Sequence, residues 1–274
     1  MIIIVSPIIQ QIARTVPNLD LKLKQAGIKY SPYDFAKRTL MSSLYMSLGI
    51  SFALWMFLSK IGKIALFPVF GWPIIFVVIF FYFMRVPDVR ILRKKKDIDS
   101  EIVFAGRFLI IEIESGVPLY DAFKNVSKNY EATGKHFSEI ITKIDFGTEM
   151  EDALTEEINL TPSASFRKIL WQIVNSQQTG ADIGGSLKSV INNIAKEQII
   201  QIKEYGRKLN PLAMFYMIIA VILPSIGITM FIVMTTFLDI KIDLAVLLTI
   251  SLLLGFVQFM FLAMIKSSRP SVGL

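Results

Sequence analysis

Four stretches of the chain are long, apolar and free of charged residues. They cover residues 39–59, 64–84, 212–238 and 244–265. Each matches the roughly 20 residues that an α-helix needs to cross the hydrocarbon core of a bilayer. Only a few residues separate the first stretch from the second, and the third from the fourth, so the pattern predicts two membrane hairpins.

The segment between the hairpins, residues 85–210, is polar overall, but its apolar residues recur at helical spacing. Ile102, Ala105 and Leu109 show this period, and six such helices can be marked out. The links between them are short, and short links join antiparallel neighbours. The sequence therefore predicts an all-α membrane protein, with four transmembrane helices in two hairpins flanking a six-helix antiparallel cytoplasmic bundle.

Local signals indicate where some of these helices begin. Thr148 followed by Glu151 fits a capping box, in which the two side chains satisfy free backbone N–H groups at a helix start. Thr161 fits a helix cap because Pro162 then occupies the first helical position, where no N–H is needed. These two positions are the expected starts of the fourth and fifth helices.

Prolines mark expected irregularities further along the chain. The sixth helix should end at about Asn210, because Pro211 follows it. Pro224 and Gly227 should bend the third apolar stretch, which neighbouring helices in a membrane tolerate.

The composition and the placement of charges predict how the chain is oriented in the membrane. The chain is 53% apolar, lacks cysteine and carries a net charge of +7. Lys and Arg flank the apolar stretches on the side of the bundle and are sparse in the hairpin links. The positive-inside rule therefore places both termini and the bundle in the cytoplasm, for a multi-pass protein of the plasma membrane. This explains the basic charge without nucleic-acid binding.

The expected domain boundaries follow: an N-terminal arm at 1–38, a hairpin at 39–84, the bundle at 85–210, a hairpin at 211–265 and a tail at 266–274. A basic cluster at the start of the bundle is expected to anchor it to lipid head groups. It consists of Arg93, Lys94, Lys95 and Lys96.

Three glycines in the stretch TGADIGGSL could form a phosphate-binding loop. Gly180 and Gly185 have the spacing of a P-loop, but Ser186 stands where the phosphate-binding lysine is required, and a helical pattern precedes the loop instead of a strand. We therefore interpret the glycines as structural. Gly180 closes one helix in the left-handed conformation, and Asp182 caps the next. Gly184 and Gly185 then allow another helix to approach closely.

No catalytic constellation and no metal-loop spacing stand out in the sequence. His136, the single histidine, is interpreted as a surface or core-edge residue. The apolar stretches lack the ionisable groups that coupled transporters place within the bilayer. The sequence thus predicts no enzyme, no cofactor and no metal site.

Four features in this order resemble the type II secretion system F-domain family. They are an arm containing LKLKQAGIKYSPYDF, a membrane hairpin, a bundle containing ESGVPLYDAF and TGADIGGSL, and a second hairpin that begins LNPLAMFYMIIAVILPSIGITM. Within the family the chain looks most like the TadC and FlaJ branch, the membrane platform proteins of tight-adherence pili and archaeal filaments. Longer members have two bundles and this chain has one, so it could work alone, as a homodimer or beside a paralogue.

The resemblance implies a platform protein without enzymatic activity. Such a protein couples a cytoplasmic hexameric secretion ATPase to the assembly of pilin-like subunits into a type IV pilus-like or archaellum-like filament. The alternative is an oligomeric small-molecule channel or transporter with a cytoplasmic regulatory bundle.

ESGVPLYDAF and QTGADIGGSL echo each other, because each places a glycine, Gly116 or Gly180, between two helices. The apolar faces of the bundle should be buried in its own core, so partner contacts are expected from charged or polar surface near these helix ends. The candidates are Glu112, Glu114, Asp121, Asp182 and Lys188.

Overall fold

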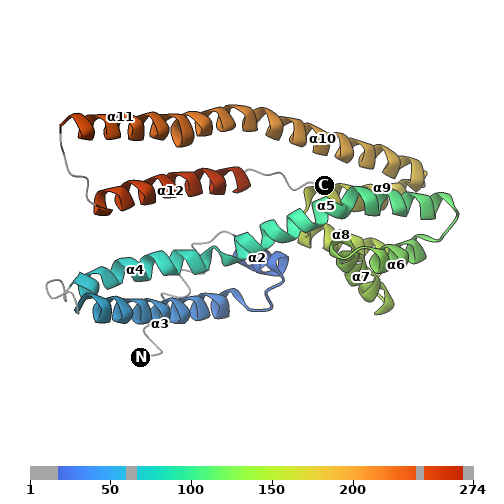
Figure 1. The fold of residues 1–274 in the computed structure, drawn as a ribbon. Helices are drawn as coiled ribbons and strands as arrows, with labels where there is room; N and C mark the ends of the chain where they lie inside the picture. The colour runs from blue at the N-terminus through green and yellow to red at the C-terminus, as the bar shows by residue number, and fades with distance from the viewer. Residues whose placement is uncertain (1–17, 60–66, 239–243, 268–274) are drawn as a thin grey trace, which may run out of the picture. The chain divides into compact units, whose positions relative to one another are not determined.

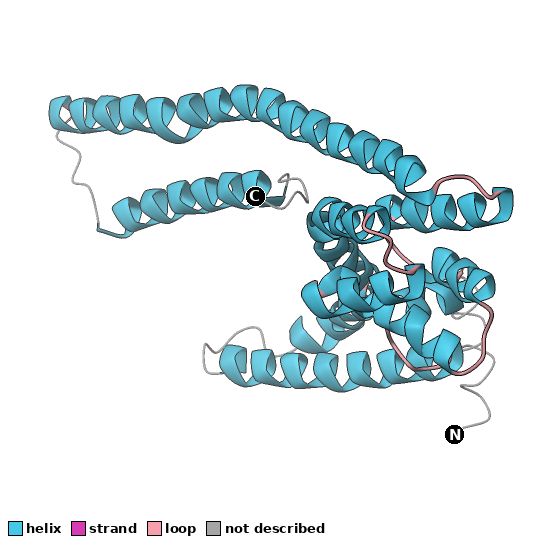
Figure 2. Ribbon diagram, turned by 90° about the vertical axis from the view of Figure 1, so that its right-hand side faces the viewer, coloured by secondary structure: helices cyan, strands magenta, loops and turns pink. Residues whose placement is uncertain are grey.

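The computed structural model describes residues 18–59, 67–238 and 244–267, and every regular element in those ranges is a helix (Figure 1, Figure 2). The chain divides into two compact units, residues 1–191 and 192–274. In chain order the elements are α2 (Leu19–Ala26), α3 (Pro32–Ser59), α4 (Phe67–Met84), α5 (Val86–Glu114), α6 (Leu119–Asn129), α7 (Ala132–Asp145), α8 (Met150–Leu160), α9 (Ala164–Thr179), α10 (Ile183–Tyr216), the π-helix η1 (Met217–Ile222), α11 (Leu223–Phe237) and α12 (Leu244–Ser267).

The first unit contains a helical bundle with a cluster of three phenylalanines in an otherwise aliphatic core. Helix α6 packs against α7, α8 packs against α9, and α5 contacts α6, α7 and α9. Phe123, Phe137 and Phe166, from three different helices, are buried together, with ring centroids 5.0 Å apart for the first two and 5.3 Å apart for the last two. Other fully buried side chains are Ile102, Leu109, Ile140, Leu154, Ile169, Leu170 and Ile173.

Thr148 does not cap α8, so the predicted capping box is wrong. The N-cap residue is Glu149, whose side chain makes no capping hydrogen bond. Thr148 belongs to the end of the preceding helix instead, because its N–H donates to the Lys143 carbonyl over 3.0 Å. That bond is the outer one of a Schellman motif, which closes α7.

Thr161 does not cap α9 either. Its N–H donates to the Glu157 carbonyl over 2.8 Å and closes α8. The cap is Ser163, whose Oγ accepts the Phe166 N–H over 3.1 Å and donates to Asp99 Oδ1 of α5 over 2.5 Å. Burial raises the pKa of the Asp99 carboxyl, and the bond from Ser163 partly offsets this effect. Ser163 thus joins α5 to α9, a tertiary role that local sequence does not show.

Helix α10 does not end at Asn210, which corrects the predicted boundary. It passes through Pro211 to Tyr216 and leads into the π-helix η1. The Leu223 N–H donates to the Ile218 carbonyl, five residues earlier, immediately before Pro224. A proline has no N–H to donate to the carbonyl four residues before it, and π turns accommodate such gaps. The irregularity therefore precedes Pro224.

Small polar residues line the contact between α3 and α4. Thr39, Ser43 and Ser47 recur every fourth residue on α3 and are buried. Trp72 of α4 donates its Nε1–H to Ser47 Oγ over 3.2 Å. Small residues at this spacing let helix backbones approach closely, which is how transmembrane helices associate when lipid replaces water.

Three helical segments among the described residues are long and apolar enough to cross a membrane. They are Pro32–Phe57, Ile183–Phe237 and Leu244–Met264. Helix α4 has 18 residues and no charged residue, but it is not among the three. The hairpin links, at 60–66 and 239–243, lie outside the described residues. The arrangement of four spans in two hairpins therefore stays a prediction.

The N-terminal arm contains a helix that the sequence pattern did not predict. Helix α2 packs against α5. Its Leu19 and Leu23 form a small core with Phe35 of α3. Lys22 Nζ lies 2.9 Å from Asp88 Oδ1 of α5. The arm is thereby attached to the base of the bundle.

Candidate functional site

The two turns that echo each other in sequence are built in the same way. Gly116, between α5 and α6, has φ +84°, and Gly180, between α9 and α10, has φ +67°. The next N–H in each case reaches back over 3.1 Å, from Val117 to the Glu112 carbonyl and from Ala181 to the Ser176 carbonyl. Only glycine adopts such φ values without strain. Both turns are therefore Schellman-type helix ends, as the position of the glycines predicts.

The two turns lie side by side at one end of the bundle. A Cβ atom on Gly184 would lie 3.3 Å from Glu114 Cγ, so the absent side chain lets the start of α10 touch the end of α5. Lys188 Nζ of α10 lies 3.8 Å from Glu114 Oε1, and both side chains are at least half exposed. We call residues 112–121 and 180–188 the hairpin end.

Asp182 caps α10, as the sequence predicts. Its Oδ1 accepts the Gly184 N–H over 3.1 Å, and its Oδ2 accepts the Gly185 N–H over 2.9 Å. A Cβ atom on Gly185 would lie 2.7 Å from Asp182 Oδ2 and would displace the carboxylate. The two N–H groups that could cradle a phosphate are thus already bound to a negative charge.

We expect the purified protein to show no saturable ATP binding, because a phosphate would have to displace Asp182. A fluorescent ATP analogue titrated against the full chain measures this. Saturable binding that disappears in Gly185→Val would show that the glycines do hold phosphate. Asp182→Ala frees these two N–H groups but should still bind no ATP, because Ser186 stands where the phosphate-binding lysine is required. The same substitution should cost about 0.5–2 kcal/mol of stability through the lost helix cap.

The remaining contact candidates differ in how far their side chains are exposed. Glu112 is half-buried and accepts the Asn125 amide over 2.8 Å, so it joins α5 to α6. Asp121 is exposed in the first turn of α6. Beside it, Tyr120 donates its hydroxyl to Asp145 Oδ1 over 2.7 Å, and this bond raises the pKa of the tyrosine. Four candidates are therefore exposed at the hairpin end, namely Glu114, Asp121, Asp182 and Lys188. Glu112 is partly buried in the contact between α5 and α6.

Two apolar side chains of the bundle lie off the buried helix faces and are exposed. Ile111 is 62% exposed one turn before Glu114, and Trp171 of α9 is 60% exposed. Trp171 directly follows the buried pair Ile169 and Leu170, so its helical phase could have shown that it points outward. Single exposed apolar side chains are normal on protein surfaces, so these two residues do not define a contact surface.

The basic cluster lies on α5, beyond the end of α4. Arg93, Lys94 and Lys96 are exposed, and Lys95 is half-buried. Arg93 follows Met84 by nine positions, so the cluster begins about 14 Å along the helix axis from the end of α4. Lys94 also reaches α2, since a Cβ atom on Gly27 would lie 2.6 Å from its Nζ. Its role as a lipid anchor stays a prediction.

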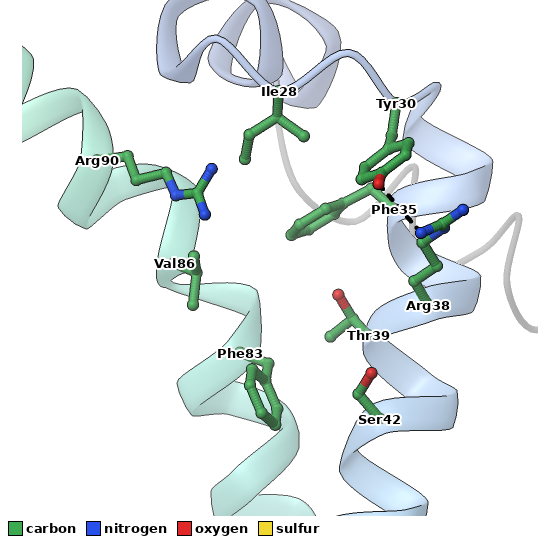
Figure 3. Close-up of a pocket in the computed structure, with 9 residues that line it drawn as sticks. All are labelled: Ile28, Tyr30, Phe35, Arg38, Thr39, Ser42, Phe83, Val86 and Arg90. Carbon is green, nitrogen blue, oxygen red and sulfur yellow. Dashed lines mark hydrogen bonds between the residues drawn. The ribbon is translucent and has the colours of Figure 1, made fainter.

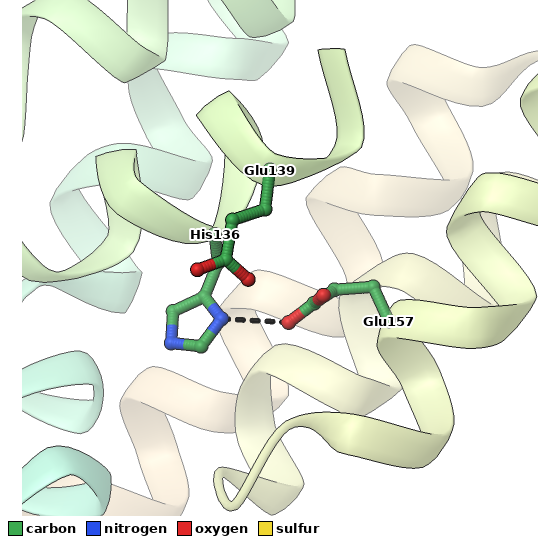
Figure 4. A group of neighbouring side chains, drawn as sticks. All are labelled: His136, Glu139 and Glu157. Carbon is green, nitrogen blue, oxygen red and sulfur yellow. Dashed lines mark hydrogen bonds and ion pairs between the residues drawn. The ribbon is translucent and has the colours of Figure 1, made fainter. Parts of the chain in front are cut away.

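His136 makes a buried polar contact that the sequence did not indicate. Its Nδ1 lies 2.6 Å from Oε1 of Glu157, which is only 1% exposed (Figure 4). Glu139 completes a group whose ligand atoms lie within 4.8 Å of one another, so these side chains could hold a metal ion. In a tetrahedral zinc site, bonds of about 2.1 Å hold ligand atoms about 3.4 Å apart. The 2.6 Å contact is instead a direct hydrogen bond, which joins α7 to α8.

Comparison with known proteins indicates a family for this chain. Residues 107–231 match the family model described as type II secretion system (T2SS), protein F, and this region contains the whole hairpin end. The match supports assignment to the type II secretion system F family. Over 153 residues the chain is 25% identical to an uncharacterized protein of Methanocaldococcus jannaschii, covering 54% of this chain and 25% of that protein. The chain thus spans about a quarter of the length of this relative. No solved structure matches the chain significantly.

Proposed function

We propose that this chain is the membrane platform of a secretion or filament-assembly system of the TadC and FlaJ type. The observation that carries the proposal is the family match over residues 107–231, which extends from the bundle into an apolar span. Members of this family are membrane platform components of secretion and pilus systems. They are structural proteins, and the hairpin end offers exposed charges and a capped helix start in place of a catalytic group.

The proposed role is to couple a cytoplasmic hexameric secretion ATPase to the assembly of pilin-like subunits. Helix α10 supports this proposal, because it starts at the hairpin end and runs without interruption for 34 residues, or about 51 Å. Through η1 and α11 the same helical run enters a span of apolar residues. A contact at the hairpin end would therefore act on a helix that continues into the membrane. A second copy of this chain or a paralogue is a further proposed partner.

Filament assembly in cells tests this role directly. We expect a strain that lacks the gene to lose its type IV pilus-like or archaellum-like filaments, as counted by electron microscopy. The wild-type gene should restore them. Filaments in normal number on the deletion strain would contradict the proposed function.

The proposed orientation places the bundle in the cytoplasm. A cysteine introduced by Ser138→Cys, at an exposed position of α7, should resist an impermeant thiol reagent in intact cells and react after lysis. A cysteine at Ile61, which lies outside the described residues, should react in intact cells and serves as the matched control. The chain has no native cysteine to interfere. Labelling at residue 138 before lysis would reverse the orientation.

A further inference from the structure

A small cavity lies where the N-terminal arm, the first apolar helix and the α4–α5 junction meet (Figure 3). Its volume is about 170 Å³. The segment between α2 and α3 supplies two of its lining residues, α3 supplies four, and α4 and α5 supply the rest. The lining residues are Ile28, Tyr30, Phe35, Arg38, Thr39, Ser42, Phe83, Val86 and Arg90.

The polar lining of this cavity suits an anion. Arg38 and Arg90 are the charged residues among the nine, and none of the nine is acidic. Thr39 and Ser42 add hydroxyl groups that can donate hydrogen bonds. A guanidinium group presents a planar fork of N–H donors that matches the oxygens of a phosphate.

Arg38 is held in place by a neighbouring tyrosine. One guanidinium N–H donates to the Tyr30 hydroxyl over 3.1 Å, and the guanidinium carbon lies 4.2 Å from the centre of the tyrosine ring. This stacking restricts the side chain while leaving other N–H donors of the guanidinium for a ligand. Less conformational freedom is then lost when an anion binds.

Nearby acidic side chains already have partners. Asp34 Oδ2 accepts the Ser31 hydroxyl over 2.8 Å at the start of α3. Asp88 forms the 2.9 Å ion pair with Lys22. Neither carboxylate lines the cavity.

The cavity lies at the boundary between charged and charge-free sequence. Arg38 directly precedes the charge-free stretch 39–59, and Phe83 lies at the end of the stretch 64–84. Arg90 follows Met84 by six residues, or about 9 Å along a helix. Long arginine side chains at helix ends reach the interfacial layer, which is roughly 5–8 Å thick on each side of the hydrocarbon core. In a membrane the cavity would therefore open at the level of the lipid head groups.

We propose that this cavity binds the phosphate of an anionic phospholipid head group. Arg38 and Arg90 contact the phosphate oxygens, and Thr39 and Ser42 donate further hydrogen bonds. Phe83 and Val86 contact the apolar part of the same lipid. The bound lipid would connect α3 to the α4–α5 junction and so fix the arm against the first hairpin. This site needs neither the ATPase nor the hairpin end, so its failure would leave the proposed function untouched.

Lipid retention by the full chain tests the site. The protein is reconstituted in nanodiscs of phosphatidylcholine alone or with phosphatidylglycerol, and retained lipid is counted by native mass spectrometry. Arg90→Gln is expected to weaken phosphatidylglycerol retention about tenfold, because a charge-assisted hydrogen bond to the phosphate is lost. Arg38→Gln should have the same effect. Arg107→Gln, an exposed position further along the same α5 helix and outside the basic cluster, is the matched control and should retain the lipid as the wild type does.

Two further measurements keep the outcomes distinct. Equal melting temperatures of the variants in phosphatidylcholine alone show that folding is intact. If Arg38→Gln lowers the melting temperature because the contact with Tyr30 is lost, the result for Arg90→Gln decides. Equal phosphatidylglycerol retention in all variants would overturn the proposal. Inorganic phosphate that stabilises the lipid-free protein through the same two arginines, and displaces no lipid, would assign the cavity to a soluble anion and would also overturn it.

Discussion

Reversing the charges of Glu114 and Asp121 is expected to weaken binding of the secretion ATPase by at least roughly tenfold and to stop filament assembly. Both side chains are exposed at the hairpin end, so the Glu114→Lys, Asp121→Lys variant should still fold. Each reversed charge at the rim of an interface changes the association free energy by on the order of 1 kcal/mol, and the two reversals add. Co-purification of the full chain with the ATPase measures the effect.

The Glu114–Lys188 contact provides a matched control. The wild-type pair is 3.8 Å apart, and Glu114→Lys combined with Lys188→Glu keeps opposite charges at these two positions while inverting the charges that a partner meets. If loss of the intrachain pair were the cause, this swap would recover ATPase binding. We expect it to remain defective. ATPase binding at the wild-type level in the Glu114→Lys, Asp121→Lys variant would remove the first turn from the contact surface.

Glu112 is a poor site for the same test, although the sequence suggests it equally. It is half-buried and accepts the Asn125 amide. Lysine there would leave that amide without its acceptor and would place an ammonium group beside it. A lost hydrogen bond typically costs about 0.5–1.5 kcal/mol, so a loss of ATPase binding in Glu112→Lys could come from weaker folding and not from the contact itself.

Truncating Phe166 is expected to produce the largest loss of stability in the bundle. The Phe166 side chain is fully buried between Phe137, whose ring centroid is 5.3 Å away, and His136, at 5.6 Å. Phe166→Ala leaves a cavity among three helices and should cost about 3–5 kcal/mol. That is a large share of the roughly 5–15 kcal/mol by which a typical domain is stable. Thermal unfolding of the full chain in nanodiscs, followed by circular dichroism and by protease resistance of the bundle, measures the loss.

Phe146 provides an exposed control of the same residue type. It lies in the turn after α7 and is 86% exposed. Phe146→Ala should change stability by no more than about 0.5 kcal/mol, as is usual for surface substitutions. Equal melting temperatures for the Phe146→Ala and Phe166→Ala variants would contradict the packing of the bundle core described here.

The features that the sequence predicted correctly depend on neighbouring residues. Gly116 and Gly180 are recognisable as helix ends because the turn that closes a helix needs a residue with positive φ, and glycine adopts positive φ most easily. Asp182 caps α10 through N–H groups only two and three residues away. Such contacts span a single turn, so spacing along the chain is enough to predict them.

The features that the sequence did not reveal depend on distant partners. Ser163 caps α9 in place of Thr161 and also donates to Asp99, which is 64 residues away. His136 bonds Glu157, 21 residues away. A single sequence does not show which helices will be neighbours, so it does not show which polar side chains will be paired.

We propose that the hairpin end couples this chain to a secretion ATPase. The most direct measurement is binding of the hexameric secretion ATPase of the same organism to the full chain in nanodiscs, by surface plasmon resonance, with empty nanodiscs as reference. We predict saturable binding by the wild-type chain and a loss of at least roughly tenfold in the Glu114→Lys, Asp121→Lys variant. No binding by a folded wild-type chain would contradict the platform assignment.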